Sequence, residues 1–296
     1  RVEGAERAAE ELAAAKVEAV IGPFTSGMVV VVAPRLAKDG ILVVSPTSTS
    51  MGLVGKDDNV VRLNGSTRDY ASAFAKALRA RGLGQLAVVW DVRNRAFSES
   101  WLAEFRRATK AEGGEVIASV PFESGPEVDF GAIVGDALLS RPDGLFFIAG
   151  ALDVARLAQH ARKRAPKLPI GAAEWASTKQ LLELGGDMVE GLLIVQQFDP
   201  TDTSAGFVAF REAYFNRFQR LPGYAAVAAY DAATALFTAL AKRKSGESAK
   251  QALLANGPYP GLQQSIAFDA TGDTKRRMFF SEVRDGRFFL VDGPRN

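Results

Sequence analysis

The stretch VEAVIGPFTSGMVVVVAPRLAKDGILVVSPTSTS, residues 17–50, contains two apolar strands that each lead into a loop rich in small hydroxyl side chains. After the first strand, the loop carries Ser26, where a helix is predicted to begin and to run to about Lys38. The free N–H groups and the dipole at this helix start favour a bound carboxylate or phosphate. The second strand, residues 41–44, runs into SPTSTS. Because parallel strands end along one edge of a sheet, both loops are predicted to bind one ligand.

Along the whole chain, predicted strands alternate with predicted helices, a pattern typical of parallel sheets covered on both faces. A length of 296 residues is large for one core, so we expect two lobes. Lobe one is predicted to comprise residues 1–66 and 199–264, and lobe two residues 67–198 and 265–296. The expected strands are 17–21, 41–44 and 60–63 in lobe one, and 85–90, 115–120, 144–149, 168–172 and 192–196 in lobe two, with a closing pair at 278–283 and 287–291.

Composition argues against several functional classes. The formal net charge is only +2 and the basic clusters are scattered, so no nucleic-acid partner is expected. The chain has no cysteine, which excludes disulfides and thiol catalysis. Its single histidine, His160, leaves no partner for a serine triad or for the common zinc sites, although serine–lysine chemistry stays open on this count. The GxxxxGK[ST] phosphate loop is absent, and MVVVVAP is too short to span a bilayer. We therefore expect no enzyme activity, no metal and no cofactor.

Several short motifs occur in the order found in one known family: IGPFTSG, SPTSTS, DVRNRAFSES, DVARLAQHARKRAP, IGAAEWAS, Tyr230-Asp231 and FDATGD. With these motifs the chain resembles the type I periplasmic solute-binding proteins of the leucine/isoleucine/valine-binding group. The resemblance extends almost to the C-terminus. It implies two parallel α/β sandwich lobes, joined by a hinge of several strands, that close over a ligand. Family members carry a strand, a helix and a second strand before the predicted helix at residues 2–16. The resemblance thus implies that the first strands of lobe one, and any signal segment, are missing from this sequence.

The resemblance also implies a set of ligand contacts. Ser26, Ser48 and Thr49 match the family's clamp for the ligand carboxylate, and Glu174 matches the glutamate that accepts hydrogen bonds from a ligand ammonium. Each has a simpler alternative. Ser26 also suits a helix N-cap, and Ser48 and Thr49 suit an ordinary turn. Glu174 also suits a solvated position at the start of a helix. A cation would offset the cost of burying its carboxylate in a closed cleft.

Five further residues complete the predicted site. Asp153 is either a second ammonium acceptor or the N-cap of the helix through His160. The sequence departs from the branched-chain pattern at two positions: Ala151 replaces a frequent aromatic, and Phe97 replaces tyrosine. Phe24 and Trp175 either line the cleft from the two lobes or belong to the core. If they line it, the ligand side chain is apolar.

The resemblance implies an extracytoplasmic substrate-binding protein of an ABC importer, with a membrane permease as partner. It also implies a location in the periplasm or an anchor at the cell surface. The implied ligand is an apolar amino acid, branched-chain or aromatic. Two alternatives stay open. The first is that the ligand is an aromatic or other ammonium-free carboxylate. The second is that the fold serves as a ligand-sensing regulatory module.

Overall fold

The computed structural model describes residues 2–291, and these divide into two compact units. Unit 1 contains the described residues up to Ser66 together with Phe198–Arg277, and unit 2 contains Thr67–Gln197 together with the described residues from Met278 onward. The chain thus passes between the units after residues 66, 197 and 277. This is the discontinuous arrangement expected of two lobes that share several crossings.

The third crossing of this division lies C-terminal to the predicted one, which ended lobe one at residue 264. Residues 265–277 stay in unit 1 because they are tied to it by specific contacts. Ile266 forms an isolated antiparallel bridge with Tyr259. Asp273 forms an ion pair with Arg62 at 2.7 Å, which joins this segment to the sheet of unit 1.

Unit 1 is built on a three-stranded parallel sheet in the order β1-β2-β3. Ile21 at the end of β1 is level with Val44 of β2, so the two loops that follow leave the sheet at the same edge. The elements in chain order are α1 (Val2–Ala14), β1 (Ala19–Ile21), α2 (Ser26–Ala37), β2 (Leu42–Ser45), the 3₁₀ turn η1 (Met51–Leu53), β3 (Val60–Arg62), α8 (Ala205–Phe218), α9 (Tyr224–Ala241) and α10 (Ala249–Ala255).

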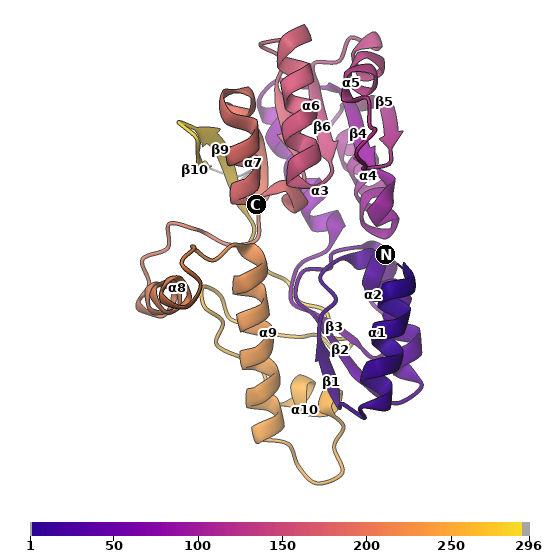
Figure 1. Cartoon of the computed structure of the whole chain (residues 1–296), viewed down its shortest axis with the longest axis vertical. Coiled ribbons are helices and arrows are strands. Elements are labelled where there is room, and N and C mark those ends of the chain that lie inside the picture. Colours follow the sequence, from indigo (N-terminus) through magenta and orange to yellow (C-terminus); the bar gives the residue numbers. More distant parts are fainter. Residues whose placement is uncertain (1, 292–296) are drawn as a thin grey trace. The chain divides into compact units, whose positions relative to one another are not determined.

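Helices cover both faces of this sheet (Figure 1). One core cluster joins α1 and α2 to β2 through Val29, Leu36 and Val43. A second cluster, on the other face, joins β2 to α9 and α10 through Val44 and Leu236. All four residues of β2 are buried, as expected for a strand enclosed between two helical layers.

Unit 2 contains a seven-stranded sheet in the order β10-β9-β8-β7-β6-β4-β5. Strands β4 to β8 run parallel, and β9 and β10 form an antiparallel hairpin added at one edge. The elements are α3 (Thr67–Ala80), β4 (Gln85–Asp91), η2 (Val92–Asn94), α4 (Arg95–Ala111), β5 (Glu115–Phe122), α5 (Phe130–Leu139), β6 (Gly144–Ile148), α6 (Ala151–Arg164), β7 (Ile170–Ala172), η3 (Glu174–Ala176), α7 (Lys179–Gly185), η4 (Gly186–Val189), β8 (Leu193–Gln196), β9 (Phe279–Arg284) and β10 (Arg287–Val291).

Helices also cover both faces of the sheet in unit 2 (Figure 1). Helices α5, α6 and α7 pack on one face, and α3 and α4 pack on the other. Alternate residues of β6 serve the two layers: Phe147 faces the first, whereas Phe146 and Ile148 face the second. The predicted α/β fold with two parallel sheets is confirmed, with most strand ends within two residues of their predicted positions.

Helix α9 is the one described helix whose length and hydropathy would allow it to cross a membrane. This is weak evidence, because the core helices of folded domains meet the same criterion. Val227, Ala235 and Ala239 of α9 are buried within unit 1. The helix also buries Asp231, which forms an ion pair with Arg276 at 2.8 Å. We therefore describe α9 as a core helix of unit 1.

Candidate functional site

The two hydroxyl loops of unit 1 meet at Ser26. This residue is the first of α2 and is only 1% exposed. Its Oγ accepts hydrogen bonds from the backbone N–H groups of Thr49 and Ser50, each at 3.3 Å. The N-cap of α2 is Thr25, so the alternative that Ser26 is the cap is wrong. Ser26 instead joins the loop after β1 to the loop after β2.

Further hydrogen bonds fix this contact between the loops. The hydroxyl of Ser45 donates to the carbonyl oxygen of Pro23 at 2.8 Å, and Thr47 donates to the carbonyl oxygen of Phe24. Ser48 is fully enclosed, and its Oγ has no hydrogen-bond partner within residues 2–291. A buried hydroxyl without a partner is uncommon and calls for an explanation, such as a bound ligand.

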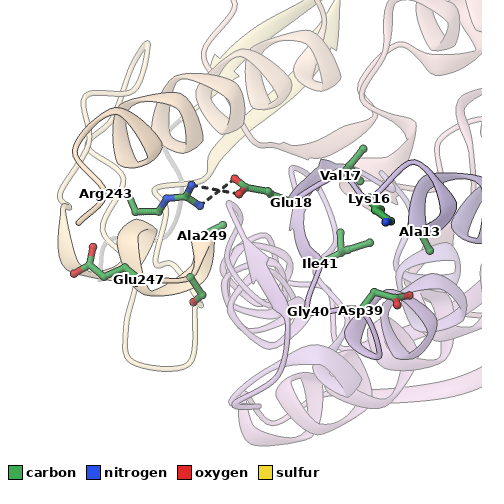
Figure 2. Close-up of a pocket in the computed structure, with 11 residues that line it drawn as sticks. Ala13, Lys16, Val17, Glu18, Asp39, Gly40, Ile41, Arg243, Glu247 and Ala249 are labelled. Carbon is green, nitrogen blue, oxygen red and sulfur yellow. Dashed lines mark hydrogen bonds and ion pairs between the residues drawn. The ribbon is translucent and has the colours of Figure 1, made fainter. Parts of the chain in front are cut away.

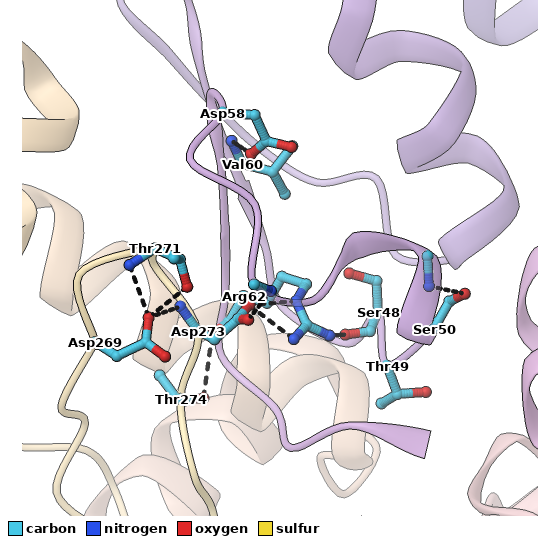
Figure 3. A network of polar contacts seen from close by, with 12 residues as sticks. Ser48, Thr49, Ser50, Asp58, Val60, Arg62, Asp269, Thr271, Asp273 and Thr274 are labelled. Atoms are coloured by element: carbon cyan, nitrogen blue, oxygen red, sulfur yellow. Dashed lines mark hydrogen bonds and ion pairs between the residues drawn. The ribbon is translucent and has the colours of Figure 1, made fainter. Parts of the chain in front are cut away.

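Arg62, at the end of β3, lies beside Ser48 of the second loop and points toward it (Figure 3). Its guanidinium is almost completely buried and lies 2.8 and 2.7 Å, through Nε and Nη2, from Oδ1 of Asp273. The Nη1 atom donates a long hydrogen bond, 3.4 Å, to the carbonyl oxygen of Ser48. The other carboxylate oxygen of Asp273 accepts from the backbone N–H of Gly55 at 2.7 Å. This network holds the serine-rich loop on a charged, buried support.

In unit 2, Glu174 lies directly after β7, in the short turn η3. It is 3% exposed, so the alternative of a solvated glutamate is wrong. Its Oε2 accepts a hydrogen bond from the indole Nε1–H of Trp101, at 2.9 Å. Its carbonyl oxygen accepts from the hydroxyl of Ser177 at 2.7 Å. A buried carboxylate thus stands at the carboxyl end of a parallel strand, where ligand sites of α/β sheets usually lie.

The aromatic and small residues predicted in unit 2 are close to Glu174 in the chain or in space. Trp175 follows it and meets the ring of Phe97 edge to face, with 5.7 Å between ring centroids and 79° between planes. Gly150 lies beside the Trp175 ring, since a Cβ built on it would be 3.7 Å from that ring. Ala151, the next residue, is buried at the start of α6.

Asp153 lies in the first turn of α6 and is also buried. The N-cap of α6 is Gly150, so the alternative that Asp153 is the cap is wrong. Burial raises the pKa of the Asp153 carboxyl above its ordinary value, and the nearby charge of Asp91 raises it further, whereas a hydrogen bond from Ser124 opposes the shift. Asp91 itself accepts from the backbone N–H groups of Arg93 and Ser124, at 2.9 and 3.2 Å.

The raised pKa of Asp153 gives a pH-dependent prediction. In the folded chain, this carboxyl keeps its proton to a higher pH than in the unfolded chain, so its ionisation costs stability above the folded pKa. The cost falls as the pH drops through that value and vanishes below the ordinary aspartate pKa. Asp153→Asn should therefore raise the stability relative to wild type most at pH 7, and this advantage should shrink toward about pH 4. Urea unfolding of both chains across this range is the measurement, and an advantage that grows on acidification contradicts the assignment.

Comparison with known proteins identifies the family. A model of the periplasmic binding protein family matches residues 1–287. The chain belongs to the periplasmic binding protein family. The fold of this family member agrees, because the leucine-binding protein LivK of Thermotoga maritima superposes with a TM-score of 0.90 at 25% identity, covering 99% of this chain and 84% of LivK. The predicted family resemblance is thereby confirmed.

Two other relatives are informative about this periplasmic binding protein. The Leu/Ile/Val-binding protein BraC3 of Rhizobium johnstonii is 25% identical over 269 residues, which are 88% of this chain and 71% of BraC3. A solute-binding protein from R. palustris was solved in complex with benzoate. It superposes with a TM-score of 0.85 at 18% identity, and the match covers 99% of this chain and 82% of the R. palustris chain. The second likeness is one of fold.

The side chain of Phe24 lines a hollow of unit 1 that contains none of the other predicted contacts of this periplasmic binding protein. This side chain is 40% exposed, and the hollow has a volume of about 590 Å³. The hollow is mainly apolar and lies over α8 and α9, with Phe210, Tyr214, Phe218 and Tyr230 among its lining residues. Its role as a ligand contact stays a prediction, as do the roles of the other eight residues.

A second hollow of unit 1, about 540 Å³, lies at the amino ends of β1 and β2 (Figure 2). Arg243 spans part of it and forms two hydrogen bonds with the carboxylate of Glu18, at 3.0 and 3.2 Å. Ligands of parallel α/β sheets bind at the carboxyl ends of the strands, which is the opposite end. Among residues 2–291, no group of three or more His, Asp or Glu side chains is placed to hold a metal ion.

Three residues that the structure connects to the predicted contacts are not predicted from the sequence: Arg62, Asp91 and Trp101. The sequence does indicate a special role for Arg62, because a charged residue inside the apolar run VVRL needs a partner if it is buried. The indication for Trp101 is weaker, since this residue follows Phe97 by one helical turn and therefore shares its face of α4. Asp91 ends a strand that the prediction closed one residue earlier.

Proposed function

We propose that this chain is the substrate-binding protein of an ABC importer and that its ligand is an apolar α-amino acid. The proposal assigns the ligand carboxylate to the hydroxyl loops of unit 1 and the ligand ammonium to Glu174 of unit 2. The two units then close on the ligand, and the bound form is the one that a membrane permease recognises. An extracytoplasmic location belongs to the same proposal.

The carboxylate end rests on one observation above all: the buried Ser48 hydroxyl has no partner within residues 2–291, although the carbonyl oxygen of the same residue accepts a hydrogen bond from Arg62. Beside it, the backbone N–H groups of Thr49 and Ser50 gather on Ser26 at the start of α2. Hydroxyls, amides and a helix N-terminus together form an environment suited to a small anion.

The ammonium end rests on the buried carboxylate of Glu174, which is accompanied in unit 2 by that of Asp153. A cation bound there would offset the cost of keeping negative charge away from water. Charge-assisted hydrogen bonds of this kind contribute about 1.5–3 kcal/mol each. Glu174 is therefore the residue that decides between an amino acid and an acid without an ammonium group.

The apolar part of the ligand is proposed to contact Phe97 and Trp175. An apolar pocket with few polar anchors is the usual arrangement of small-molecule sites. The same residues would also accept an aromatic carboxylate, and the R. palustris relative was solved with benzoate. An ammonium-free acid is therefore the second candidate ligand, with the same family and the same clamp in unit 1.

A thermal-shift screen of the purified chain tests this proposal, because a ligand that binds only the folded state stabilises it by about 2.7 kcal/mol at one hundred times its Kd. The panel contains the standard amino acids and a set of aliphatic and aromatic carboxylates. We expect a shift with apolar α-amino acids. A shift confined to ammonium-free acids would contradict the assigned ligand, and no shift with any member would contradict the proposal as a whole. A pull-down from membranes then separates the importer role, which requires a permease, from a sensing role.

A further inference from the structure

Trp101 makes a contact that no role in core packing requires. Its indole ring lies on α4 and is fully buried among the rings of Phe74, Phe105 and Phe146, with centroid distances of 6.4, 6.1 and 5.2 Å. Phenylalanine is smaller but would provide a comparable apolar aromatic contact without the N–H group. The indole Nε1–H, however, donates to Oε2 of Glu174 at 2.9 Å.

Helix α4 holds two consecutive residues of η3. Phe97 and Trp101 are one helical turn apart on α4, so both side chains point from the same face. Phe97 packs against Trp175, and Trp101 binds Glu174. The turn after β7 is therefore fixed by one aromatic contact and one hydrogen bond from a single helix.

The hydrogen bond fixes the carboxylate in two respects. Because the Trp101 ring is enclosed by three other rings, its N–H has one direction, and the carboxylate that accepts from it takes the matching orientation. A donor aimed at an anionic oxygen also stabilises the ionised form of that group. Both effects prepare Glu174 to receive a cation.

We infer that Trp101 is a positioning residue for Glu174 and that its indole N–H gives the site its preference for ligands that carry an α-ammonium group. The inference rests on the proposed function, because it assumes that Glu174 receives the ligand ammonium. Trp101 itself contacts Glu174 and makes no contact with the ligand in this account. Its effect should consequently appear as a selectivity between ligands and not as a uniform loss of binding.

The test compares leucine with 4-methylpentanoate, which has the same side chain and carboxylate but no ammonium group. In Trp101→Phe we expect the Kd of leucine to rise about ten-fold or more, because an oriented hydrogen bond to a charged group is lost. The Kd of 4-methylpentanoate should change by no more than about two-fold, the usual scatter of context effects. Equal losses for both acids, or no loss for leucine, would overturn the inference.

The chain offers a matched control at Trp90. This residue packs against the same aromatic core, and its indole Nε1 is buried without a hydrogen-bond partner within residues 2–291. Trp90→Phe removes an N–H group from the same core but leaves Glu174 untouched. It should therefore leave the ratio of the two Kd values at the wild-type level, whereas a change as large as that of Trp101→Phe would overturn the inference.

A double-mutant cycle separates this inference from the proposed function. If Glu174→Gln alone weakens leucine binding, adding Trp101→Phe should weaken it little further, since both changes remove parts of one interaction. A full additive loss would overturn the positioning role and leave the proposed function intact. If Glu174→Gln alone leaves leucine binding unchanged, the ammonium contact of the proposed function fails first, and the inference fails with it.

A spectroscopic measurement covers the case in which Trp101→Phe does not fold. The chain has three tryptophans, so ¹⁵N-indole spectra contain three Nε1–H signals, and Trp90→Phe and Trp175→Phe identify two of them. The third signal, that of Trp101, should move upfield in Glu174→Gln, because a neutral amide is a weaker acceptor than a carboxylate. A displacement no larger than that of the Trp90 signal would overturn the inference.

Discussion

Glu174→Gln should weaken the binding of an apolar α-amino acid by about ten- to one-hundred-fold, the loss that corresponds to one charge-assisted hydrogen bond. The change keeps the size of the side chain and leaves a carbonyl oxygen to accept from Trp101 Nε1–H, so the fold around η3 should be preserved. What disappears is the negative charge that is proposed to meet the ligand ammonium. Titration calorimetry of both chains with leucine measures the effect.

The matched ligand for this variant is 4-methylpentanoate, whose affinity should change little because it has nothing to offer Glu174. A leucine affinity that is the same in both chains would remove Glu174 from the binding site. A parallel loss for both acids would instead indicate damage to the turn after β7.

Asp273→Ala should lower the free energy of unfolding of unit 1 by about 3–5 kcal/mol, the usual cost of removing one partner from a buried ion pair. The guanidinium of Arg62 is 1% exposed, and Asp273 accepts from two of its nitrogens. Without Asp273, a full positive charge stays buried and unpaired. The carboxylate also accepts from the backbone N–H of Gly55, so a second hydrogen bond, an exposed one, is lost as well.

The control for this prediction is Asp57→Ala. Asp57 forms an ion pair with Lys250 at 3.0 Å in the same unit, but its side chain is 91% exposed. Such pairs contribute about 0–1 kcal/mol. Urea unfolding followed by circular dichroism should therefore show a far larger drop of the midpoint for Asp273→Ala. Equal drops would show that the Arg62 pair carries no special weight.

Asp273→Ala also links stability to binding. Arg62 Nη1 donates to the carbonyl oxygen of Ser48, so a displaced guanidinium should loosen the loop proposed to bind the ligand carboxylate. Unlike Glu174→Gln, this variant is expected to weaken leucine and 4-methylpentanoate to a similar degree. The two variants thus test separately the two contacts proposed for the ligand.

The gathering of Ser26 with the SPTSTS loop could be predicted from the sequence because it depends on sheet topology alone. Two apolar strands joined by a helix run parallel, and their carboxyl ends then lie side by side. The register of β1 and β2, with Ile21 beside Val44, is the physical basis of that prediction. Contacts of this kind follow from periodicity and connectivity.

The contact between Trp101 and Glu174 could not be predicted in the same way. The residues are separated by 73 positions, and their approach depends on how α4 packs against the sheet of unit 2 and on the rotamer of one indole ring. A tryptophan on the apolar face of a helix is normally predicted to be a core residue, and Trp101 is indeed part of the core. Only the direction of its N–H reveals the second role.

Helix ends were a further source of error. An N-cap role is the alternative for both Ser26 and Asp153, but the observed caps are Thr25 and Gly150. Helix α2 therefore starts one residue earlier, and helix α6 three residues earlier, than those alternatives require. The seven-residue helix α10 is not predicted from the sequence. Its Ser248 and Gln251 nevertheless form a capping box, which the sequence shows as the motif S-x-x-Q. Its shortness hides any apolar periodicity.

A crystal structure of the chain with its best-stabilising amino acid tests the central claim most directly. The account predicts that the ligand carboxylate accepts hydrogen bonds from the loop of Ser48 and Thr49, and that the ligand nitrogen lies within about 3.2 Å of a carboxylate oxygen of Glu174. An amino acid bound with its nitrogen away from Glu174, or with its carboxylate away from both hydroxyl loops, would contradict it.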